Sequence, residues 1–307
     1  MSHGRGIRLF LVDGTPNGLL TAEIMNWTGH ALTSPRTKLT ELVKRAECGR
    51  TGVYFLVGPD PENAMRPVVY IGESDDVAKR LKQHNRPESQ GGKDFWERVC
   101  LITSKDQNLT KAHVKYLESR LMAVAKQSGR CGLVNGTAHE YTVLPESDQA
   151  DMAFFIEQIR ILLPVLGFDF LREPVATHTG PSVQSDIVFE MNLPTYEVSA
   201  TAREIEGQFV ILKGSEARPK WTAKPNGYGN LYDQLVKDGV LTETQNNKRL
   251  FANDFEFNSP SAAAAIVAGR NTNGRTKWQV KGRQENYGEW QSAIVDAQSA
   301  IGDPAFD

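Results

Sequence analysis

The sequence has few cysteines and no long apolar run. Its three cysteines (Cys48, Cys100 and Cys131) contain no CxxC pair, which argues against a zinc site or a disulfide framework and indicates reduced thiols. No stretch approaches the roughly 20 apolar residues that a membrane helix needs. The apolar run near the N-terminus ends at Asp13-Gly14 and is too short for a secretory signal. These features predict a cytoplasmic protein that does not contact a membrane.

The chain also lacks an overall excess of charge of one sign. It has 35 Lys and Arg against 37 Asp and Glu, which gives a net charge of −2. The charges are segregated, however: residues 50–145 carry +3, residues 146–209 carry −8 and residues 210–290 carry +4. Two mildly basic blocks on either side of an acidic one are compatible with contact with nucleic acid.

Apolar periodicity predicts an α+β fold, with a small antiparallel sheet flanked by helices and a second small α+β domain. Two of the expected strands form a hairpin with a long, turn-rich loop. The helix after this hairpin has Ser74 or Asp75 as its N-cap and runs to His84, and Pro164 should end or kink a later helix. The remaining expected elements are strands at 7–12, 52–57, 67–72 and 96–103 and helices at 37–45, 109–126 and 147–163.

A proline-rich stretch with little periodicity divides the chain, so we expect a linker there, with a short strand at 186–191 as an option. The second domain should end its core with a helix that has Ser259 as N-cap, Pro260 at its first position and Gly269 just past its end. Its other expected elements are strands at 195–200, 208–213 and 254–257 and a helix at 231–238. The expected organisation is an N-terminal extension at 1–49, a first domain at 50–171, a linker at 172–194, a second domain at 195–290 and an acidic tail at 291–307.

The helix after the hairpin carries two chemically active side chains on its inward face. At about 100° per residue, Arg80 and His84 share the side of the apolar positions. An arginine there can neutralise a phosphate and a histidine can move a proton. The alternative is an arginine stem that packs at the edge of the core and reaches solvent. Lys79 and Lys82, on the outer side, are candidates for contacts with nucleic acid.

The helix at 109–126 carries a carboxylate, Glu118, at the edge of its apolar stripe. A carboxylate in this position needs a cation, a base or water. Mg²⁺ favours oxygen ligands and accepts one or two protein carboxylates, so Glu118 is a candidate metal ligand. A salt bridge to a nearby lysine or arginine is the alternative.

Two tyrosines and an asparagine complete the set of candidates. Tyr54 and Tyr70 lie on adjacent strands of the hairpin, each in a triplet with a glycine, GVY and YIG. Half-buried packing is the default for a strand tyrosine, but two phenols on neighbouring strands can also project to one side. Asn135 stands in the sequence VNGT, which is typical of a turn.

The order GVY, YIG, KRLKQH, a glutamate within a long helix and then an asparagine resembles the GIY-YIG nuclease family. The resemblance covers roughly residues 50–140. Val53 replaces the isoleucine of the family name, and the hairpin loop is longer than is typical. Glu73, directly after YIG, either assists a metal or, as we favour, caps the next helix. The resemblance implies a metal-dependent endonuclease that hydrolyses DNA phosphodiester bonds.

The resemblance also implies roles for the individual residues. Glu118 would hold Mg²⁺ or Mn²⁺, and Arg80 would neutralise the phosphate. Tyr54 would act as the base and His84 would relay its proton, although a free phenol with a pKa near ~10 needs positive charge nearby. The phosphate and the water would be positioned by Tyr70 and Asn135.

Residues 210–290 resemble a small domain of unknown function that follows GIY-YIG domains in some bacterial proteins. The segments ILKGSEAR, LYDQLVKDGVL and FNSPSAAAAIVAGRNTNGRTKW carry this resemblance, which implies no activity. Basic residues alternate there with Trp221 and Trp278, a pattern that suits nucleic-acid strands but also a solvated face over core tryptophans. The candidate contacts are Lys213, Arg218, Lys220, Lys224, Arg275 and Lys277.

Two other classes of function stay open at this stage. One is a DNA-binding module that has no catalytic activity, and the other is a regulatory protein whose C-terminal domain recruits a protein partner or forms a homodimer. An endonuclease of this kind could serve restriction, phage defence or DNA repair, and the sequence does not choose among them.

Overall fold

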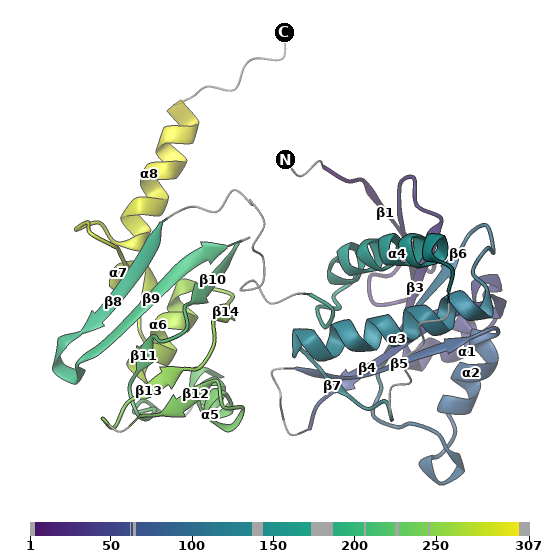
Figure 1. Cartoon of the computed structure of the whole chain (residues 1–307), viewed down its shortest axis with the longest axis horizontal. Helices are drawn as coiled ribbons and strands as arrows, with labels where there is room; N and C mark the ends of the chain where they lie inside the picture. The colour runs from purple at the N-terminus through teal and green to yellow at the C-terminus, as the bar shows by residue number, and fades with distance from the viewer. Residues whose placement is uncertain are drawn as a thin grey trace. The chain divides into compact units, whose positions relative to one another are not determined.

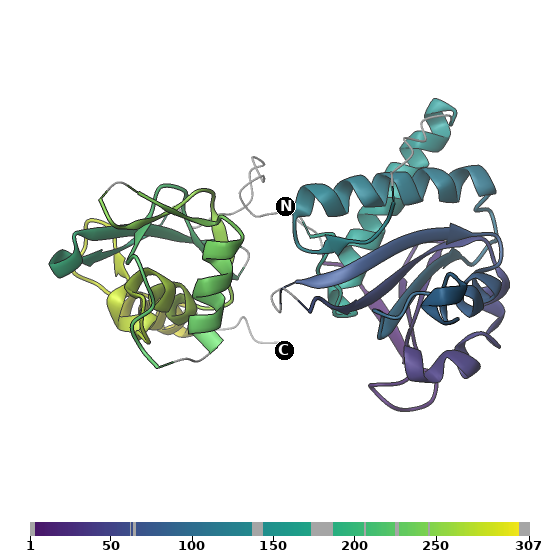
Figure 2. The same ribbon diagram turned by 90° about the horizontal axis from the view of Figure 1, so that it is seen from below.

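The computed structural model describes residues 4–61, 63, 66–136, 144–172, 187–205, 207–224, 227–244 and 246–300. The chain forms two compact units, Met1–Glu173 and Pro174–Asp307 (Figures 1 and 2). Each unit combines helices with mostly antiparallel strands, so the α+β prediction is confirmed. None of the helices that the structure describes is long and apolar enough to cross a membrane.

A seven-stranded sheet forms the centre of the N-terminal unit (Figure 1). The strands are β1 (Ile7–Leu11), β2 (Leu20–Ile24), β3 (Gly29–Pro35), β4 (Gly52–Pro59), β5 (Pro67–Ser74), β6 (Arg98–Ser104) and β7 (Gly132–Leu133). Their order is β1-β2-β3-β6-β4-β5-β7, and the neighbours are antiparallel except for the parallel pair β5 and β7.

Helices cover both faces of this sheet. Because strand side chains alternate between faces, Val53 and Phe55 of β4 pack into one core, whereas Tyr54 and Leu56 pack into the other. The first core lies under α3 (Lys111–Ser128) and α4 (Glu146–Val165), and the second lies against α1 (Leu39–Leu42) and α2 (Val77–His84). Figure 2 shows α3 and α2 on opposite sides of the strands. Short 3-10 turns complete the unit at η1 (Arg36–Lys38), η2 (Ala46–Gly49) and η3 (Glu88–Gln90).

The hairpin of β4 and β5 and the long helix α3 lie where the sequence predicts them, but several expected boundaries are wrong. Residues 1–49 are not an extension, because β2 and β3 belong to the sheet and β3 pairs with β6. Local periodicity does not reveal a pairing between such distant segments. The helix expected at 37–45 is reduced to α1 between short turns. The N-cap of α2 is Asp76, whose carboxylate accepts from the Lys79 amide at 2.9 Å, and not Ser74 or Asp75. Helix α4 continues one residue past Pro164.

The C-terminal unit is built on two sheets, with the strand orders β14-β10-β9-β8-β15 and β11-β13-β12. Helices and a 3-10 turn lie between these strands, and one helix, α8, follows the last of them. In chain order the elements are β8 (Val188–Leu193), η5 (Pro194–Tyr196), β9 (Val198–Ile205), β10 (Gln208–Ile211), β11 (Glu216–Ala217), α5 (Gly227–Lys237), β12 (Leu241–Glu243), β13 (Arg249–Phe251), β14 (Phe255–Phe257), α6 (Pro260–Ala268), α7 (Gly274–Lys277), β15 (Gln279–Val280) and α8 (Tyr287–Ala300).

Helix α6 lies in the core of this unit. Its residues from Ala262 to Ala268 are all buried, as expected for a helix that is apolar on all sides. The side chain of Ser259 accepts from the Ala262 amide at 3.1 Å and caps the helix. Pro260 occupies the first turn, and Gly269 follows the helix with a φ of 58°. The three positions predicted for this helix are therefore confirmed.

Two segments cross the limits that we expected for the second domain. Strand β8, within the expected linker, pairs with β9 along its whole length and buries Phe189 and Met191 in the core. Helix α8 begins inside the expected domain, where Trp290 is buried, and continues into the expected acidic tail, where residues 292–296 are exposed. Burial of these apolar side chains stabilises β8 and the start of α8 as parts of the unit. Residues 173–186 of the linker and 301–307 of the tail lie outside the described residues.

Candidate active site

The predicted residues gather around the second half of β5, near an open edge of the sheet. In the part of the chain that the structure describes, β7 pairs with β5 at Val68 and Val69 and leaves the following residues of β5 without a strand on that side. Helix α2 lies on one face of β5 and α3 on the other. The end of β5 is therefore reached by side chains from both helices as well as from β4.

On the α2 face, Tyr54 and His84 form a buried pair. The Tyr54 hydroxyl and His84 Nε2 lie 2.8 Å apart, and the two residues are 0% and 3% exposed. The ring of Tyr70 stands beside both, with its centroid 5.1 Å from that of His84 and 6.2 Å from that of Tyr54. Tyr70 is only half-buried, so it is the tyrosine that reaches the surface.

Gly72 of the YIG triplet makes this arrangement possible. It pairs with Tyr54 across the hairpin, and a Cβ at this position would lie 2.4 Å from the Tyr54 hydroxyl and 2.9 Å from the Tyr70 ring. Both distances are shorter than carbon atoms tolerate. The glycine is therefore required by the close approach of the two tyrosines, since its backbone has no need of a left-handed conformation.

The electrostatic environment keeps both members of the buried pair uncharged. Burial raises the pKa of Tyr54 far above its ordinary value, and Tyr70 adds to this effect while Arg80 opposes it. Burial also lowers the pKa of His84 to about 4, together with the positive charges of Arg80 and Lys93. At neutral pH the pair is thus a phenol and a neutral imidazole.

Two cationic side chains lie near the Tyr54–His84 pair, on the side where Tyr70 reaches the surface. The side chain of Arg80 is exposed and donates to Gln83 Oε1 at 2.8 Å. Partial burial alone would lower the pKa of Arg80, but the hydroxyl groups of Tyr54 and Tyr70 raise it overall. Lys93, which the sequence did not single out, places its ammonium group 4.4 Å from the centre of the Tyr70 ring. An anion that approached Tyr70 would meet both positive charges.

On the α3 face, two carboxylates lie close to each other. Glu118 is half-buried, and burial raises its pKa to about 7, with the charge of Glu73 as the second cause. Lys111 and Arg80 oppose the rise in pKa. The carboxylate of Glu73 accepts from Lys111 Nζ at 2.6 Å. The expectation that Glu73 caps α2 is therefore wrong, because Glu73 faces α3 beside Glu118.

These carboxylates suit a hard divalent cation. A half-buried carboxylate with a second one beside it is costly to ionise, and a bound cation would remove that cost. Among the described residues no group of three or more His, Cys, Asp or Glu side chains is arranged to hold a metal ion. One or two carboxylates with open positions for water and phosphate oxygens fit Mg²⁺ or Mn²⁺ better than zinc, which prefers three or four protein ligands.

The side chain of Asn135 binds the backbone of β5 with both of its polar atoms. Its Oδ1 accepts from the Ile71 amide at 2.9 Å, and its Nδ2 donates to the Ile71 carbonyl oxygen at 2.6 Å. The side chain thus continues the hydrogen bonding of β7 along β5. This geometry assigns Asn135 to holding the backbone of the YIG triplet, and not to orienting phosphate or water directly as we expected.

The basic residues predicted to contact nucleic acid differ in their exposure and in whether their side chains already bind neighbouring groups. Arg218 is held inside the C-terminal unit, with its guanidinium 3.9 Å from the centre of the Tyr196 ring and a hydrogen bond of 3.2 Å to the Ala268 carbonyl. Arg275 donates to Gln291 of α8. The residues with exposed side chains are Lys79, Lys82, Lys213, Lys220, Lys224, Arg275 and Lys277.

The two basic segments of the C-terminal unit lie at opposite ends of α6. The Arg218 and Thr222 amides donate to the carbonyls of Val267 and Gly269, whereas the Gly274 amide donates to Ser261 Oγ. Nine residues of helix separate these ends by about 13 Å.

Of the two tryptophans in these segments, Trp278 is a core residue. It is fully buried, and its ring centroid lies 5.1 Å from that of Phe209. Its indole N–H donates to the Pro260 carbonyl at 3.0 Å. The interpretation of Trp278 as part of the core is therefore the correct one, and this ring is not available to stack on a base.

Comparison with known proteins gives a match within the C-terminal unit. Residues 189–291 match a family described as a domain of unknown function (DUF4357). No curated protein and no solved structure matches the chain. The likeness of residues 50–140 to GIY-YIG nucleases stays a prediction. The C-terminal unit is thus similar to DUF4357 domains, in agreement with the domain of unknown function that we expected there.

Proposed function

We propose that the N-terminal unit is a divalent-metal-dependent endonuclease that hydrolyses phosphodiester bonds of DNA. The observation that carries this proposal is the convergence of Tyr54, His84, Tyr70, Arg80 and Glu118 at one end of β5, although they are far apart in sequence. A proton acceptor, a phosphate-binding cation and a carboxylate for a metal are the groups that hydrolysis of a phosphodiester needs.

The proton path would run through the buried pair. Tyr54 is a phenol at neutral pH, so it can accept a proton from the attacking water only if it passes its own proton to His84 Nε2, 2.8 Å away. The oxygen–hydrogen bond of water would break as the new bond to Tyr54 forms, and hydroxide would be delivered to phosphorus. His84 is available for this because its low pKa keeps it unprotonated.

Substrate binding would strengthen this base. The charges of Arg80 and Lys93 lower the pKa of His84, and a phosphate bound between them would offset both charges. The imidazole would then hold a proton more readily once the substrate is in place. Tyr54 is fully buried, so its hydroxyl must become accessible on the Tyr70 side when the phosphate binds.

The metal would be held by Glu118, with Glu73 beside it. When bound, Mg²⁺ or Mn²⁺ would supply charge that polarises a phosphate oxygen and stabilises the leaving 3′ oxygen. Arg80 would share the negative charge of the five-coordinate phosphate. The roles that remain for Tyr70 and Asn135 are to contact the phosphate and to hold the backbone at Ile71.

A plasmid-nicking assay with and without Mg²⁺ tests the proposal. We expect relaxed or linear DNA from the full chain in Mg²⁺ or Mn²⁺, none in chelator, and none from Glu118→Gln. Glu157→Gln, which changes an exposed carboxylate on α4, should cut like the unaltered chain. Cutting by Glu118→Gln at the unaltered rate would contradict the proposed site.

Complete burial of Tyr54 favours one alternative, a scaffold that grips DNA without cutting it. In that case the cations near Tyr70, Arg80 and Lys93, would still bind DNA, and the carboxylates would be structural. Binding of DNA without cleavage in any divalent metal would support this alternative. Absence of DNA binding would instead point to a regulatory protein.

A further inference from the structure

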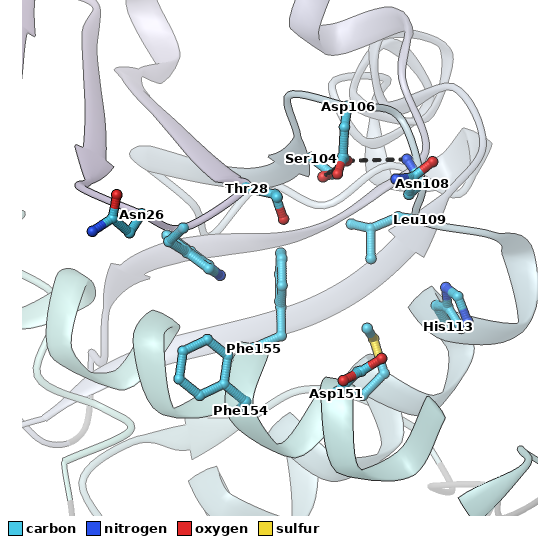
Figure 3. Close-up of a pocket in the computed structure, with 12 residues that line it drawn as sticks. Asn26, Thr28, Ser104, Asp106, Asn108, Leu109, His113, Asp151, Phe154 and Phe155 are labelled. Carbon is cyan, nitrogen blue, oxygen red and sulfur yellow. Dashed lines mark hydrogen bonds between the residues drawn. The ribbon is translucent and has the colours of Figure 1, made fainter. Parts of the chain in front are cut away.

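A cavity in the N-terminal unit lies apart from the proposed nuclease residues. It has a volume of about 290 Å³ and is lined by the turn between β2 and β3, the segment from β6 to α3 and the first turns of α4 (Figure 3). None of the residues that we predicted to be catalytic is among the described residues that line it. Its size is near the lower end of small-molecule sites.

Three aromatic side chains contribute to the lining of this cavity. Trp27 and Phe155 pack together with ring centroids 4.9 Å apart, and Phe154 is 54% exposed. In Figure 3, Phe154 and Phe155 rise from α4 opposite the segment that carries Asn26 and Thr28. Apolar, planar surface is therefore presented at an opening in the protein, where it favours a flat ligand.

Trp27 also offers an unused hydrogen-bond donor. The residue is only 5% exposed, and its indole Nε1 is buried without a hydrogen-bond partner among the described residues. A buried donor without an acceptor destabilises a folded protein. The nitrogen has almost no accessible surface, so the Trp27 ring must shift slightly for an acceptor atom of a ligand in the cavity to bind this N–H.

The polar groups of the cavity disfavour a phosphate. No lysine or arginine is among the described residues that line it, and two carboxylates, Asp106 and Asp151, contribute to the lining. His113 is engaged on both sides: its Nδ1 accepts from the Thr110 amide at 3.3 Å, and its Nε2 lies 3.3 Å from Asp148. A ligand with amino groups fits these carboxylates, whereas an anion would be repelled.

We propose that this cavity binds a nucleobase. A base has a planar ring for the aromatic wall, a ring nitrogen or carbonyl to accept from Trp27, and in most cases an exocyclic amino group to donate to Asp106 or Asp151. The base could belong to a free nucleoside or to a nucleotide turned out of a DNA strand. Such a site would be additional to the proposed nuclease function and would not need the metal.

One possible ligand is a free nucleoside. Calorimetric titration of the full chain in chelator, with adenosine, guanosine, cytidine and thymidine in turn, tests whether it binds. We expect at least one nucleoside to bind, and its 5′-monophosphate to bind more weakly. Trp27→Phe keeps an aromatic ring and removes the donor, so it should weaken binding about 2- to 13-fold, the equivalent of a neutral hydrogen bond of about 0.5–1.5 kcal/mol.

Trp96→Phe is the matched control. Trp96 is 1% exposed, its Nε1 is also buried without a partner among the described residues, and it belongs to the core on the opposite face of the sheet. This variant should bind nucleosides like the unaltered chain. Equal nucleoside binding by Trp27→Phe and the unaltered chain would show that free nucleosides do not bind through Trp27.

The other possible ligand is a base turned out of a DNA strand. Binding of a single-stranded oligonucleotide in chelator tests this possibility. If the base comes from DNA, Trp27→Phe should weaken oligonucleotide binding while Trp96→Phe does not, and free nucleosides should bind weakly or not at all. Failure of both nucleosides and oligonucleotide to depend on Trp27 would overturn the proposal. Because chelator prevents metal-dependent cleavage, this result is independent of the nicking assay, and Glu118→Gln should leave nucleoside binding unchanged.

Discussion

Buried tyrosines occur in both units, but their partners differ. In the C-terminal unit, burial raises the pKa of Tyr232 and of Tyr287 to about 12, and each hydroxyl donates to a fixed acceptor: the Arg218 carbonyl and, at 3.1 Å, Glu204. In the N-terminal unit, the Tyr54 hydroxyl meets a neutral histidine that can take its proton. Burial alone therefore does not make a tyrosine reactive, and the nature of its partner decides.

The two units also differ in where their charged groups lie. The N-terminal unit brings Arg80, Lys111, Glu73 and Glu118 within electrostatic reach of one another at one end of β5. The basic residues of the C-terminal unit are exposed or tied to neighbours at opposite ends of α6. We therefore expect the N-terminal unit to be catalytic and the C-terminal unit to contribute no more than additional DNA binding.

The largest effect should come from Glu118→Gln. The amide keeps the shape of the side chain but removes the charge for the metal, so we expect the single-turnover cleavage rate to fall by at least about 10³-fold, since a metal contributes several kcal/mol to such a reaction. DNA binding measured in chelator should stay within a few-fold of that of the unaltered chain. An equal loss of binding and cleavage would show that Glu118 supports the fold instead.

The next largest effect should distinguish the two tyrosines. Tyr54→Phe removes the group that passes a proton, and general acid–base catalysis contributes about 10²–10⁴-fold. Tyr70→Phe removes one neutral hydrogen bond of about 0.5–1.5 kcal/mol and should cost much less. Single-turnover rates in saturating Mg²⁺ would measure both. Tyr116→Phe, a buried tyrosine of α3, is the control, and equal losses for Tyr54 and Tyr70 would remove the special role of Tyr54.

A smaller effect should follow removal of the C-terminal unit. A fragment of residues 1–173 retains both cores of the N-terminal unit, so we expect it to fold and to nick DNA. It should bind DNA more weakly, and the log–log salt slope should fall by about 0.9 for each phosphate of duplex DNA that the fragment no longer neutralises. Parallel slopes with equal affinity would show that the C-terminal unit does not touch DNA.

The smallest effect concerns stability and pH without metal. The pKa of Glu118 rises from 4.5 to about 7 on folding, so its contribution to stability is full below pH 4.5 and is lost as the pH rises through 7. Glu118→Gln cannot ionise, and should therefore melt higher than the unaltered chain at pH 8 but not at pH 4.5. A difference of roughly 2–4 °C corresponds to about 1 kcal/mol in a domain of this size.

Added Mg²⁺ should sharpen the same experiment. At pH 8 the cation should raise the melting temperature of the unaltered chain, because it binds the folded state. It should have little effect on Glu118→Gln. A matching rise in both proteins would place the metal somewhere other than Glu118.

The elements that local patterns predicted best are those with a strong signal in their own residues. The hairpin of β4 and β5 and the helices α2, α3 and α6 follow from alternation and helical periodicity, and α6 also from its capping residues. Several strands that we missed, β7, β11, β12, β13 and β15, have only two or three residues, which is too short for a periodic pattern. We also missed β2 and β3, and β3 pairs with β6 from far along the chain, a pairing that has no local signature. We placed β8 in the linker although it pairs with the adjacent strand β9.

The types of residue and the faces they occupy were readable from the amino-acid order: an arginine and a histidine on one side of α2, a carboxylate on α3 and two tyrosines on a hairpin. Their distances and charges depended on the folding of distant segments. Burial against α2 keeps Tyr54 protonated, and burial together with the charge of Glu73 raises the pKa of Glu118. The hydrogen bonds between Ile71 and Asn135 assign a predicted site residue to holding the backbone. A pKa reflects the surroundings in three dimensions, and a linear sequence does not contain them.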